Sequence, residues 1–368
     1  MKLRVDQIVK LLQIKGLGRT KVIRFAELVE FNLSNDQELA EVLHEQLSSL
    51  KIPILSKEEI IQAFAKGEAI LEKSEASGIK TISIFDSTYP LLLSNSSTPP
   101  VLLNYLGDLS TINEMVTVAV IGTRDPSTYG KTIGERIGYL LSQNGLSVVS
   151  GLALGCDTAA HIGCLKGGGR TVAVLAHGLD NVYPRENKNL ADKILDMGGC
   201  IVSEYMIGTK PFATHFIDRD RIQAGLSKAT IVVETDIKGG TMHTVNFTLD
   251  YNRILAAFRH PMEKQNDKSR GNEMLIEQGK AIGLETKDDI DALIHLINPT
   301  SKNNPFSNGI PIAEIQLPLF AESEFEMLSH PQNEKVKKPR RKRTKPDLTQ
   351  SKIFKDESDI RPGSDTDK

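Results

Sequence analysis

Apolar and polar positions follow a regular pattern between residues 115 and 298. Short runs rich in Val, Ile and Ala predict buried strands, and the amphipathic segments between them predict helices. We expect strands at 116–121, 147–150, 171–176, 200–203, 230–234 and 254–258, and helices at 130–144, 157–166, 186–197, 216–226 and 240–251, with a last helical unit at 272–296. This alternation is typical of an α/β fold with a doubly wound, mostly parallel, Rossmann-like sheet.

Residues 1–75 have a helical spacing of apolar positions and predict a small N-terminal module. Two amphipathic runs flank Gly16-Leu17-Gly18, a pattern typical of a helix-hairpin-helix or SAM-like module. In such a turn the N–H groups that open the second helix can hold a DNA phosphate. A plain αα-hairpin with a glycine turn is the alternative.

Two further segments flank the predicted main domain. Residues 78–114 carry strand, turn and proline signals and predict a connecting lobe packed on the edge of that domain. Residues 299–368 lose the apolar pattern and predict a mostly disordered tail. Its block at 335–345 is strongly basic, which favours sequence-independent attraction to nucleic acid, with a merely solubilising tail as the alternative.

Composition narrows the class of protein further. The net charge of -2 argues against a basic nucleic-acid coat. Cys156, Cys164 and Cys200 form no Cys-x-x-Cys pair, so we expect neither a disulfide framework nor a metal site. Since the chain has neither an 18-residue apolar run nor a signal-peptide pattern, we expect a cytoplasmic protein with no membrane partner.

Two glycine-rich turns follow neighbouring predicted strands. The first is Gly122-Thr123-Arg124, with Gly130 shortly after it, and the second runs from Ser150-Gly151 to Gly155. Turns at the ends of neighbouring parallel strands open onto one crevice, where backbone N–H groups can bind an anion. Arg124 adds a planar set of donors suited to phosphate, so we predict a polyanion site; pairing of Arg124 with a carboxylate is the alternative.

Other polar residues allow two interpretations each. Asp157 stands where a helix N-cap belongs and His161 lies one turn later, so both are expected to be structural. Arg185 follows a strand on the crevice side and either contacts the ligand or is a solvated surface charge. Arg219 and Arg221 flank Asp220 and either line one groove or form a local ion-pair network.

A series of linked motifs from about residue 85 to 295 resembles the DprA/Smf family of DNA-processing proteins. The motifs are Tyr89-Pro90, Pro99-Pro100, Gly122-Thr123-Arg124, Ser150-Gly151 through Asp157 and His161, Gly178-Leu179-Asp180, Tyr183-Pro184, Asn187, Ser203-Glu204-Tyr205, Phe216 through Ser227, Gly239-Gly240, Thr244 and Gly271-Asn272. The resemblance implies a Rossmann-like fold that binds single-stranded DNA, loads a RecA-type recombinase during natural transformation and forms a homodimer.

Residues of the predicted crevice and the matched motifs together give the expected nucleic-acid contacts. They are Gly122, Arg124, Gly130, Ser150, Gly151, Gly155, Arg185, Asn187, Arg219, Arg221, Gly239, Gly240 and Thr244. Tyr129, Tyr183 and Phe216 are candidate stacking platforms. The chain departs from the family at Asp220, where Asn is usual, and it lacks a visible C-terminal winged helix, so repair or defence against foreign DNA stays open beside transformation.

An enzyme is the competing hypothesis. Gly239-Gly240-Thr241 after Glu234 faintly resembles the turn of nucleotide phosphoribohydrolases, but the following helix offers no carboxylate before Asp250. The chain has neither a P-loop nor a Gly-x-Gly-x-x-Gly motif, so we expect no ATP hydrolysis, cofactor or catalytic residue. A pure interaction scaffold would leave the glycine-rich crevice unexplained.

Overall fold

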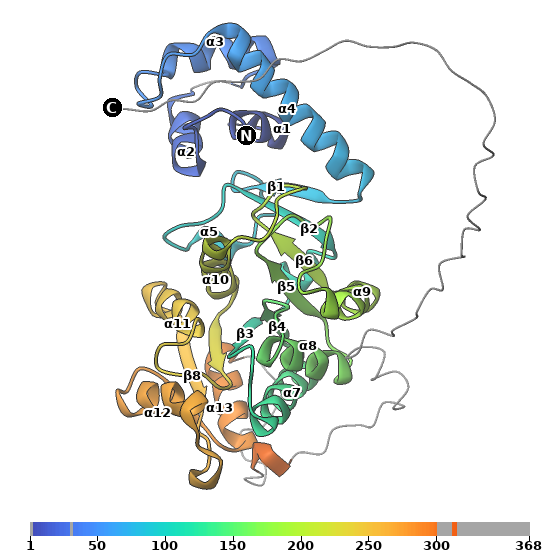
Figure 1. Ribbon diagram of the computed structural model, residues 1–368, viewed down its shortest axis with the longest axis vertical. Coiled ribbons are helices and arrows are strands. Elements are labelled where there is room, and N and C mark those ends of the chain that lie inside the picture. Colours follow the sequence, from blue (N-terminus) through green and yellow to red (C-terminus); the bar gives the residue numbers. More distant parts are fainter. Residues whose placement is uncertain (1–2, 30–31, 300–310, 315–368) are drawn as a thin grey trace, which may run out of the picture. The chain divides into compact units, whose positions relative to one another are not determined.

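The computed structural model describes residues 3–29, 32–299 and 311–314 (Figure 1). Their strands join one sheet in the order β1-β2-β6-β5-β4-β3-β7-β8-β9. The strands are β1 (Lys80–Ser83), β2 (Leu102–Gly107), β3 (Thr117–Ile121), β4 (Ser147–Ser150), β5 (Thr171–Leu175), β6 (Cys200–Ser203), β7 (Ala229–Val232), β8 (Ile254–Phe258) and β9 (Ile282–Leu284). From β6 to β9 every neighbouring pair is parallel, whereas β1 pairs with β2 and β2 with β6 in the antiparallel sense.

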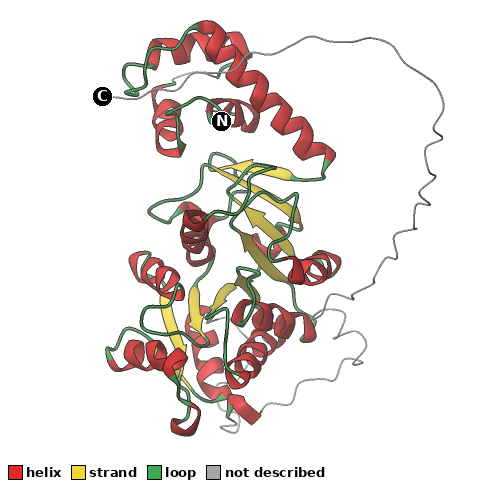
Figure 2. Ribbon diagram, viewed as in Figure 1, coloured by secondary structure: helices red, strands yellow, loops and turns green. Residues whose placement is uncertain are grey.

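Helices cover both faces of this sheet (Figure 2). The main-domain helices are α5 (Leu91–Ser94), α6 (Ser110–Asn113), α7 (Thr128–Gln143), α8 (Cys156–Lys166), α9 (Lys188–Asp196), α10 (Ala213–Leu226), α11 (Thr241–Asp250), α12 (Arg270–Glu277) and α13 (Lys287–Ile297), with short 3-10 helices η1 (Arg185–Asn187), η2 (Met262–Lys264), η3 (Asp267–Ser269) and η4 (Ile312–Glu314).

Alternate side chains of each central strand enter different hydrophobic clusters, as strand geometry requires. On β3, Val118 and Val120 pack with α7, α8 and α13, while Ala119 and Ile121 pack with α11 and α12. Because both faces are covered, the strands are apolar throughout, and all five residues of β3 are buried. The sheet therefore holds the strand ends, and the turns that follow them, in fixed positions.

Within residues 3–29 and 32–76, the helices that precede the sheet are α1 (Val5–Leu11), α2 (Arg19–Leu28), α3 (Asp36–Gln46) and α4 (Lys57–Ala76). They enclose their own core, in which Ile8, Phe25, Leu43 and Phe64 are buried, and Leu102 of β2 belongs to the same cluster. Gly16 has φ +86°, the left-handed region that favours glycine, and Gly18 is the N-cap of α2. The hairpin turn is therefore present, and its contact with DNA stays a prediction.

The predicted fold class, a mostly parallel doubly wound sheet with N-terminal helices, is confirmed. Two details differ from the expectation, and the disordered tail stays a prediction. The lobe does more than pack on the domain, because its β1 and β2 extend the sheet through β6. The last helical unit is interrupted by β9, a three-residue strand too short for periodicity to reveal. The predicted tail lies outside the described residues except for residues 299 and 311–314, where Ile312 is fully buried in the main core.

Candidate nucleic-acid interface

A crevice of about 620 Å³ opens at the carboxyl ends of β3 and β7. The chain continues from β3 to β4 on one side, whereas β7 lies on the other, so the order of strands reverses here. Ligands of open α/β sheets bind at this kind of point. The crevice is lined by Gly122, Thr123, Arg124, Ala153, Asp157, Ala213, Phe216, Ile217, Arg219, Asp220, Gln223, Thr235, Asp236, Gly239, Gly240, Thr241, His243, Thr244 and Lys268.

The first turn leaves β3 at Gly122, where the backbone is closely packed. A Cβ at this position would lie 2.5 Å from the Sγ of Cys156 and 2.9 Å from the carbonyl oxygen of Glu234. Thr123 N–H donates to the Glu234 carbonyl at 2.8 Å, and Cys156 N–H donates to the Thr123 carbonyl at 3.1 Å. Gly122 is therefore required for packing; it also lines the crevice, and its contact with nucleic acid stays a prediction.

Gly130, Gly151 and Gly155 are also closely packed. A Cβ on Gly130 would collide with the carboxylate of Glu234, and one on Gly151 with the guanidinium of Arg219. Gly155 has φ +85°, and a Cβ at this position would lie only 2.5 Å from the Thr123 carbonyl oxygen. At Gly240, by contrast, nothing lies within 4 Å of a built Cβ, so its backbone is open to a ligand. Gly130, Gly151 and Gly155 are therefore required for packing, whereas Gly240 leaves the backbone accessible to a ligand.

The second turn, residues 151–153, is held by three buried side chains from three elements. The Asp157 carboxylate accepts from the N–H groups of Gly151 at 3.0 Å and Ala153 at 3.4 Å. Arg219 Nη1 donates to the Gly151 carbonyl at 2.7 Å and Asn187 Nδ2 to the Leu152 carbonyl at 2.8 Å. This network holds Leu152 in the left-handed region at φ 55°, which is uncommon for a branched side chain.

Asp157 therefore differs from its expected role. The N-cap of α8 is Gly155, and Asp157 binds the preceding loop instead of the first turn of the helix. Burial raises the pKa of its carboxyl group, and Arg219 opposes the rise. His161 is fully buried with Nδ1 2.8 Å from Thr171 Oγ1, and burial lowers its pKa to about 3. His161 is thus neutral, which supports a structural role.

The two arginines of α10 are also engaged inside the protein. Arg219 is 5% exposed and donates to the carbonyl of Val174 at 2.8 Å and, through Nε, to Asp220 at 3.1 Å. Arg221 is 3% exposed and pairs with Glu204 and the Thr98 carbonyl. These contacts favour the ion-pair interpretation over direct contact with phosphate for both residues.

Two other expected contacts, Ser150 and Asn187, have structural partners. Ser150 Oγ donates to the Val120 carbonyl at 2.7 Å, and Asn187 also donates to Thr158 Oγ1 at 2.8 Å. Both residues are buried. Thr244 is buried as well but lines the crevice together with Gly239.

Arg124 is the exposed arginine of the crevice. Its guanidinium carbon lies 4.7 Å from the centroid of the Phe216 ring, and the Phe216 and Tyr183 centroids are 6.1 Å apart. Tyr183 is 49% exposed, and Arg185, also exposed, follows it by two residues without lining the crevice. Tyr129 is not part of this row, because it packs against Phe258 and His260.

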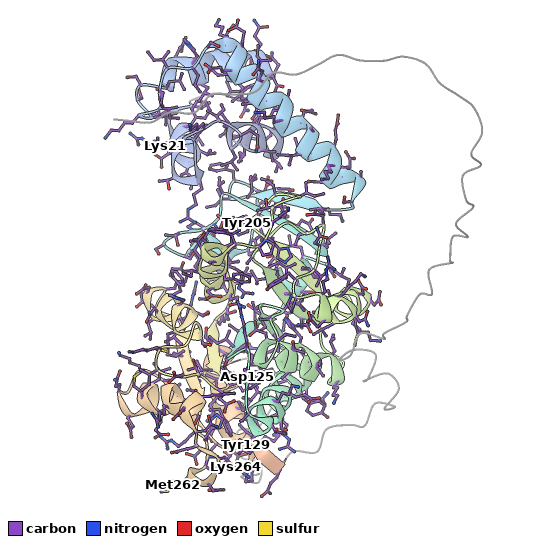
Figure 3. All side chains as sticks on the ribbon, viewed as in Figure 1. Lys21, Asp125, Tyr129, Tyr205, Met262 and Lys264 are labelled. Atoms are coloured by element: carbon purple, nitrogen blue, oxygen red, sulfur yellow. The ribbon has the colours of Figure 1, made fainter. Side chains whose placement is uncertain are left out.

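Sequence reasoning missed Lys268, Asp236 and His243 at the crevice. Lys268 lies in η3 and pairs with Asp125 at 2.5 Å. Asp125 stands in the turn between β3 and α7 (Figure 3). No strand-end signal marks this polar loop in the sequence. Asp220 contributes a carboxylate whose pKa burial raises to about 6, against the effect of Arg219. The crevice is therefore mixed in charge, with carboxylates on its floor and Arg124 and Lys268 at its edge.

Asn272 and Glu234 fasten the surrounding turns. Asn272 Nδ2 donates to the carbonyls of Val233 at 3.0 Å and Phe258 at 2.9 Å, which ties the ends of β7 and β8 together. The Glu234 carboxylate accepts from Ser127 N–H at 2.7 Å and Ser127 Oγ at 2.9 Å, at the start of α7. Glu234 is fully buried, so its carboxylate is committed to structure.

These features define a Rossmann-like α/β protein with a crevice at the topological switch point and an arginine at its edge. Residues 80–295 match the family described as DNA recombination-mediator protein A, and the chain belongs to this family. The resemblance to DprA/Smf proteins is thereby confirmed.

Three proteins illustrate the similarity. DNA processing protein DprA of Streptococcus pneumoniae is 34% identical over 288 residues, which cover 78% of this chain and 98% of that protein. Its crystal structure covers 79% of this chain and 98% of its own, with a TM-score of 0.66. Protein Smf of Synechocystis is 36% identical over 58% of this chain, but the match spans only 53% of that longer protein.

A structure of DNA processing protein A from Helicobacter pylori, described as showing a single-stranded DNA binding mode, covers 59% of this chain and 95% of its own. It is 28% identical, with a TM-score of 0.52. Within the described residues no helix is long and apolar enough to span a membrane, and no three His, Cys, Asp or Glu side chains group into a metal site.

Proposed function

We propose that this chain binds single-stranded DNA along the crevice edge and transfers it to a RecA-type recombinase. Family membership and the single-strand binding of the Helicobacter protein support the proposal. The row formed by Arg124, Phe216 and Tyr183 carries it, because single-strand binding needs a cation for the backbone and aromatic faces for the bases.

The exposed ring of Tyr183 favours unpaired bases over a duplex. Tyr183 offers half of its surface to solvent, and a base can stack on such a ring only after it leaves its neighbours in the helix. Gly240 adds an open backbone at the start of α11, where N–H groups can meet a phosphate. Arg185 would contact the DNA backbone where the strand extends beyond the crevice.

A hydrolase is the weaker candidate for this crevice. Glu234 would be its acid or base, but Ser127 and Asn266 already donate to its carboxylate. The first turn of α11 contains no acidic side chain to replace it. We therefore propose a non-catalytic protein. Turnover of a nucleoside monophosphate by the wild type, lost in a folded Glu234→Gln variant, would contradict this.

A salt-titrated comparison of single- and double-stranded DNA by fluorescence anisotropy tests the binding proposal. We expect tighter binding of the single strand, and a large loss in an Arg124→Ala, Arg185→Ala double variant. The matched control is Lys188→Ala, Lys193→Ala on α9, which removes the same charge from exposed positions away from the crevice. If both double variants lost the same DNA affinity, the protein would be attracting DNA through its net charge and not through the crevice edge.

Transfer to the recombinase needs a separate assay. A RecA-type recombinase is supplied with single strands already coated by a single-strand-binding protein, and its ATP hydrolysis is followed. We expect the wild-type chain to shorten the lag before hydrolysis and the Arg124→Ala, Arg185→Ala variant to leave it long. A wild-type chain that binds DNA without shortening the lag would remove the transfer step and leave binding intact.

A further inference from the structure

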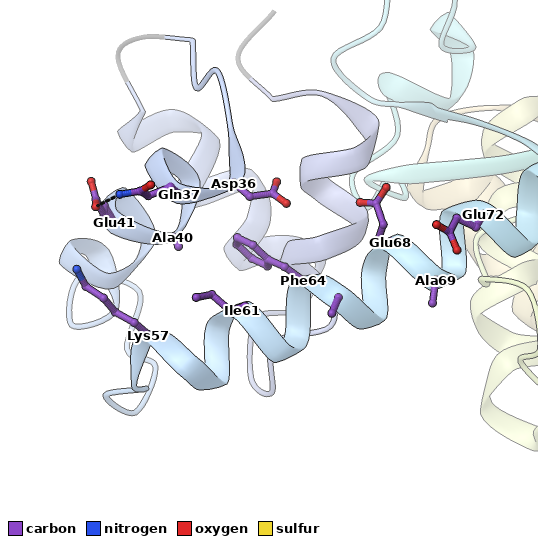
Figure 4. A pocket seen from close by; sticks show the side chains of 11 residues that line it. Asp36, Gln37, Ala40, Glu41, Lys57, Ile61, Phe64, Glu68, Ala69 and Glu72 are labelled. Atoms are coloured by element: carbon purple, nitrogen blue, oxygen red, sulfur yellow. Dashed lines mark hydrogen bonds between the residues drawn. The ribbon is translucent and has the colours of Figure 1, made fainter.

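The N-terminal module has a groove that the DNA-binding proposal does not use. It lies between α3 and α4 and has a volume of about 800 Å³ (Figure 4). Its lining residues are Asp36, Gln37, Ala40, Glu41, Lys57, Ile61, Phe64, Ala65, Glu68, Ala69 and Glu72. Lys57 lies at one end of the groove and Glu68 and Glu72 at the other (Figure 4).

The floor of the groove is apolar and partly uncovered. Ile61 is 60% exposed although it lies beside Phe64, which belongs to the core of the module. Ala40 of α3 faces the same space from the opposite helix (Figure 4). Small alanine side chains on facing helices leave room for another side chain, so the groove can accept an apolar residue that would cover Ile61.

The rim of the groove is acidic. Asp36, Glu41, Glu68 and Glu72 stand around it against the single cation Lys57 among the lining residues. Below the rim, Lys10 pairs with Asp36 at 2.8 Å and Glu68 at 2.7 Å, while Glu41 accepts from Gln37. Burial alone would lower the pKa of Lys10, but these hydrogen bonds outweigh it and the pKa is raised. Lys10 thus stays charged. Among the described residues the exposed carboxylates of Glu41 and Glu72 form no ion pair, so they can meet a basic side chain of a ligand.

Charges of the two signs are separated within the module. α3 carries four carboxylates and no lysine or arginine, whereas α2 carries three basic residues and one acidic residue. Nucleic acid is repelled by the first surface and attracted by the second. The groove is therefore not an extension of a DNA path.

We propose that this groove docks an amphipathic helix of a partner protein, with an apolar stripe flanked by Lys and Arg. Two helices with a groove between them receive a third helix by its apolar face, with anchors at i, i+3, i+4 and i+7. The acidic rim is complementary to basic flanks, which sets the orientation and speeds association. The inference does not depend on DNA binding at the crevice.

The test uses the full chain and a synthetic 14-residue helical peptide of Leu and Lys with its leucines on one face. Three variants are titrated: Ile61→Asp, the pair Glu41→Lys with Glu72→Lys, and the control pair Glu45→Lys with Glu75→Lys. The control residues are exposed, lie on the same two helices and change the net charge equally, but do not line the groove. We expect the first two variants to lose about tenfold or more in affinity, or 1.4 kcal/mol.

Several outcomes would overturn the proposal. Equal losses in the two charge-reversed pairs would show that the peptide responds to net charge. Binding of a Leu and Glu peptide with similar affinity would remove the role of the rim. If wild-type chain self-associates in sedimentation and Ile61→Asp makes it monomeric, the occupant is a second copy. If the peptide binds only after residues 330–368 are removed, the occupant is that segment. Single-strand affinity, measured in parallel, should be the same in wild type and Ile61→Asp.

Discussion

The Arg124 guanidinium carbon lies 4.7 Å from the centroid of the Phe216 ring, which pairs the turn after β3 with helix α10. The Arg124 side chain makes no hydrogen bond or ion pair with the described residues, so its donors are available to a ligand. The ring supports the planar group by cation–π attraction, which is worth about 0.5–1 kcal/mol at an exposed site. The alternative that a carboxylate holds Arg124 finds no support in this geometry.

Replacing Arg124 by Ala should weaken single-strand binding by about 1–3 kcal/mol, since one charge-assisted contact is lost. The slope of log affinity against log salt should shrink by about 0.7, the value for one phosphate of a single strand. Phe216→Leu should weaken binding but leave that slope unchanged, because it removes a stacking face and no charge. Anisotropy titrations at several salt concentrations check both, and a changed slope in Phe216→Leu would contradict the division of roles.

Arg219→Met should destabilise the fold by about 3–5 kcal/mol, because it leaves buried carboxylates without their cation. The carbonyls of Gly151 and Val174 would also lose their donor. Urea unfolding measures this loss, with Arg185→Ala as the control that should stay within about 0.5 kcal/mol of wild type. An Arg219→Met protein of normal stability and lowered DNA affinity would return Arg219 to the list of DNA contacts.

Asp220 should make stability depend on pH. Its pKa is raised from 3.8 to about 6, so the folded state binds this proton more tightly than the unfolded chain does. The contribution of Asp220 to the free energy of unfolding is therefore most favourable below pH 3.8, and it is lost as the pH rises through about 6. Relative to wild type, Asp220→Asn should gain stability between pH 4 and pH 7.5, by at most about 3 kcal/mol at about 1.4 kcal/mol per pKa unit.

Urea unfolding at the two pH values checks the Asp220 prediction, with the exposed Asp250→Asn as the matched control. Parallel pH profiles of wild type and Asp220→Asn would contradict it. Because Asn also removes a negative charge from the crevice floor, DNA affinity at pH 7.5 should rise.

Two glycines should separate folding from binding. Gly155→Ala forces a Cβ into the left-handed region and against the Thr123 carbonyl, so it should cost more than about 1 kcal/mol of stability. Gly240 has helical angles and open space, so Gly240→Ala should keep the melting temperature and obstruct the ligand's approach to the backbone. Thermal melting measures the effect of each substitution on stability, and anisotropy titration measures its effect on DNA affinity. Unchanged affinity in Gly240→Ala would show that the DNA binds elsewhere.

Periodicity predicted the central strands within one or two residues, because strands covered on both faces are apolar without interruption. It also placed the first turn and Arg124 at the crevice, since parallel strands end at one edge. Strand β9 was missed because three residues carry no period. The prediction that Asp157 is the N-cap of α8 was wrong. Gly155, which has a positive φ, occupies the N-cap position immediately before the helix begins at Cys156.

The arginines show where sequence reasoning stops. Arg124 and Arg219 have the same side chain, and both were expected to contact nucleic acid at the crevice. Arg124 is exposed beside the Phe216 ring. Arg219 is instead enclosed by the carbonyl groups of Gly151, just after β4, and Val174, within β5, which lie 68 and 45 residues away in the chain. Burial of this kind depends on long-range packing, which no local pattern encodes. Lys268 joins the crevice for the same reason, through its pair with Asp125.

The loop around Leu152 has a consequence for how a ligand is received. Since Asp157, Asn187 and Arg219 hold its backbone from three separate elements, we expect the loop to keep this conformation when single-stranded DNA binds. The loss of conformational entropy on binding should therefore come mainly from the flexible nucleic acid, because this part of the protein surface is already ordered. Association should show little sign of a slow rearrangement of the protein, and the DNA should adopt the path that this edge of the sheet imposes.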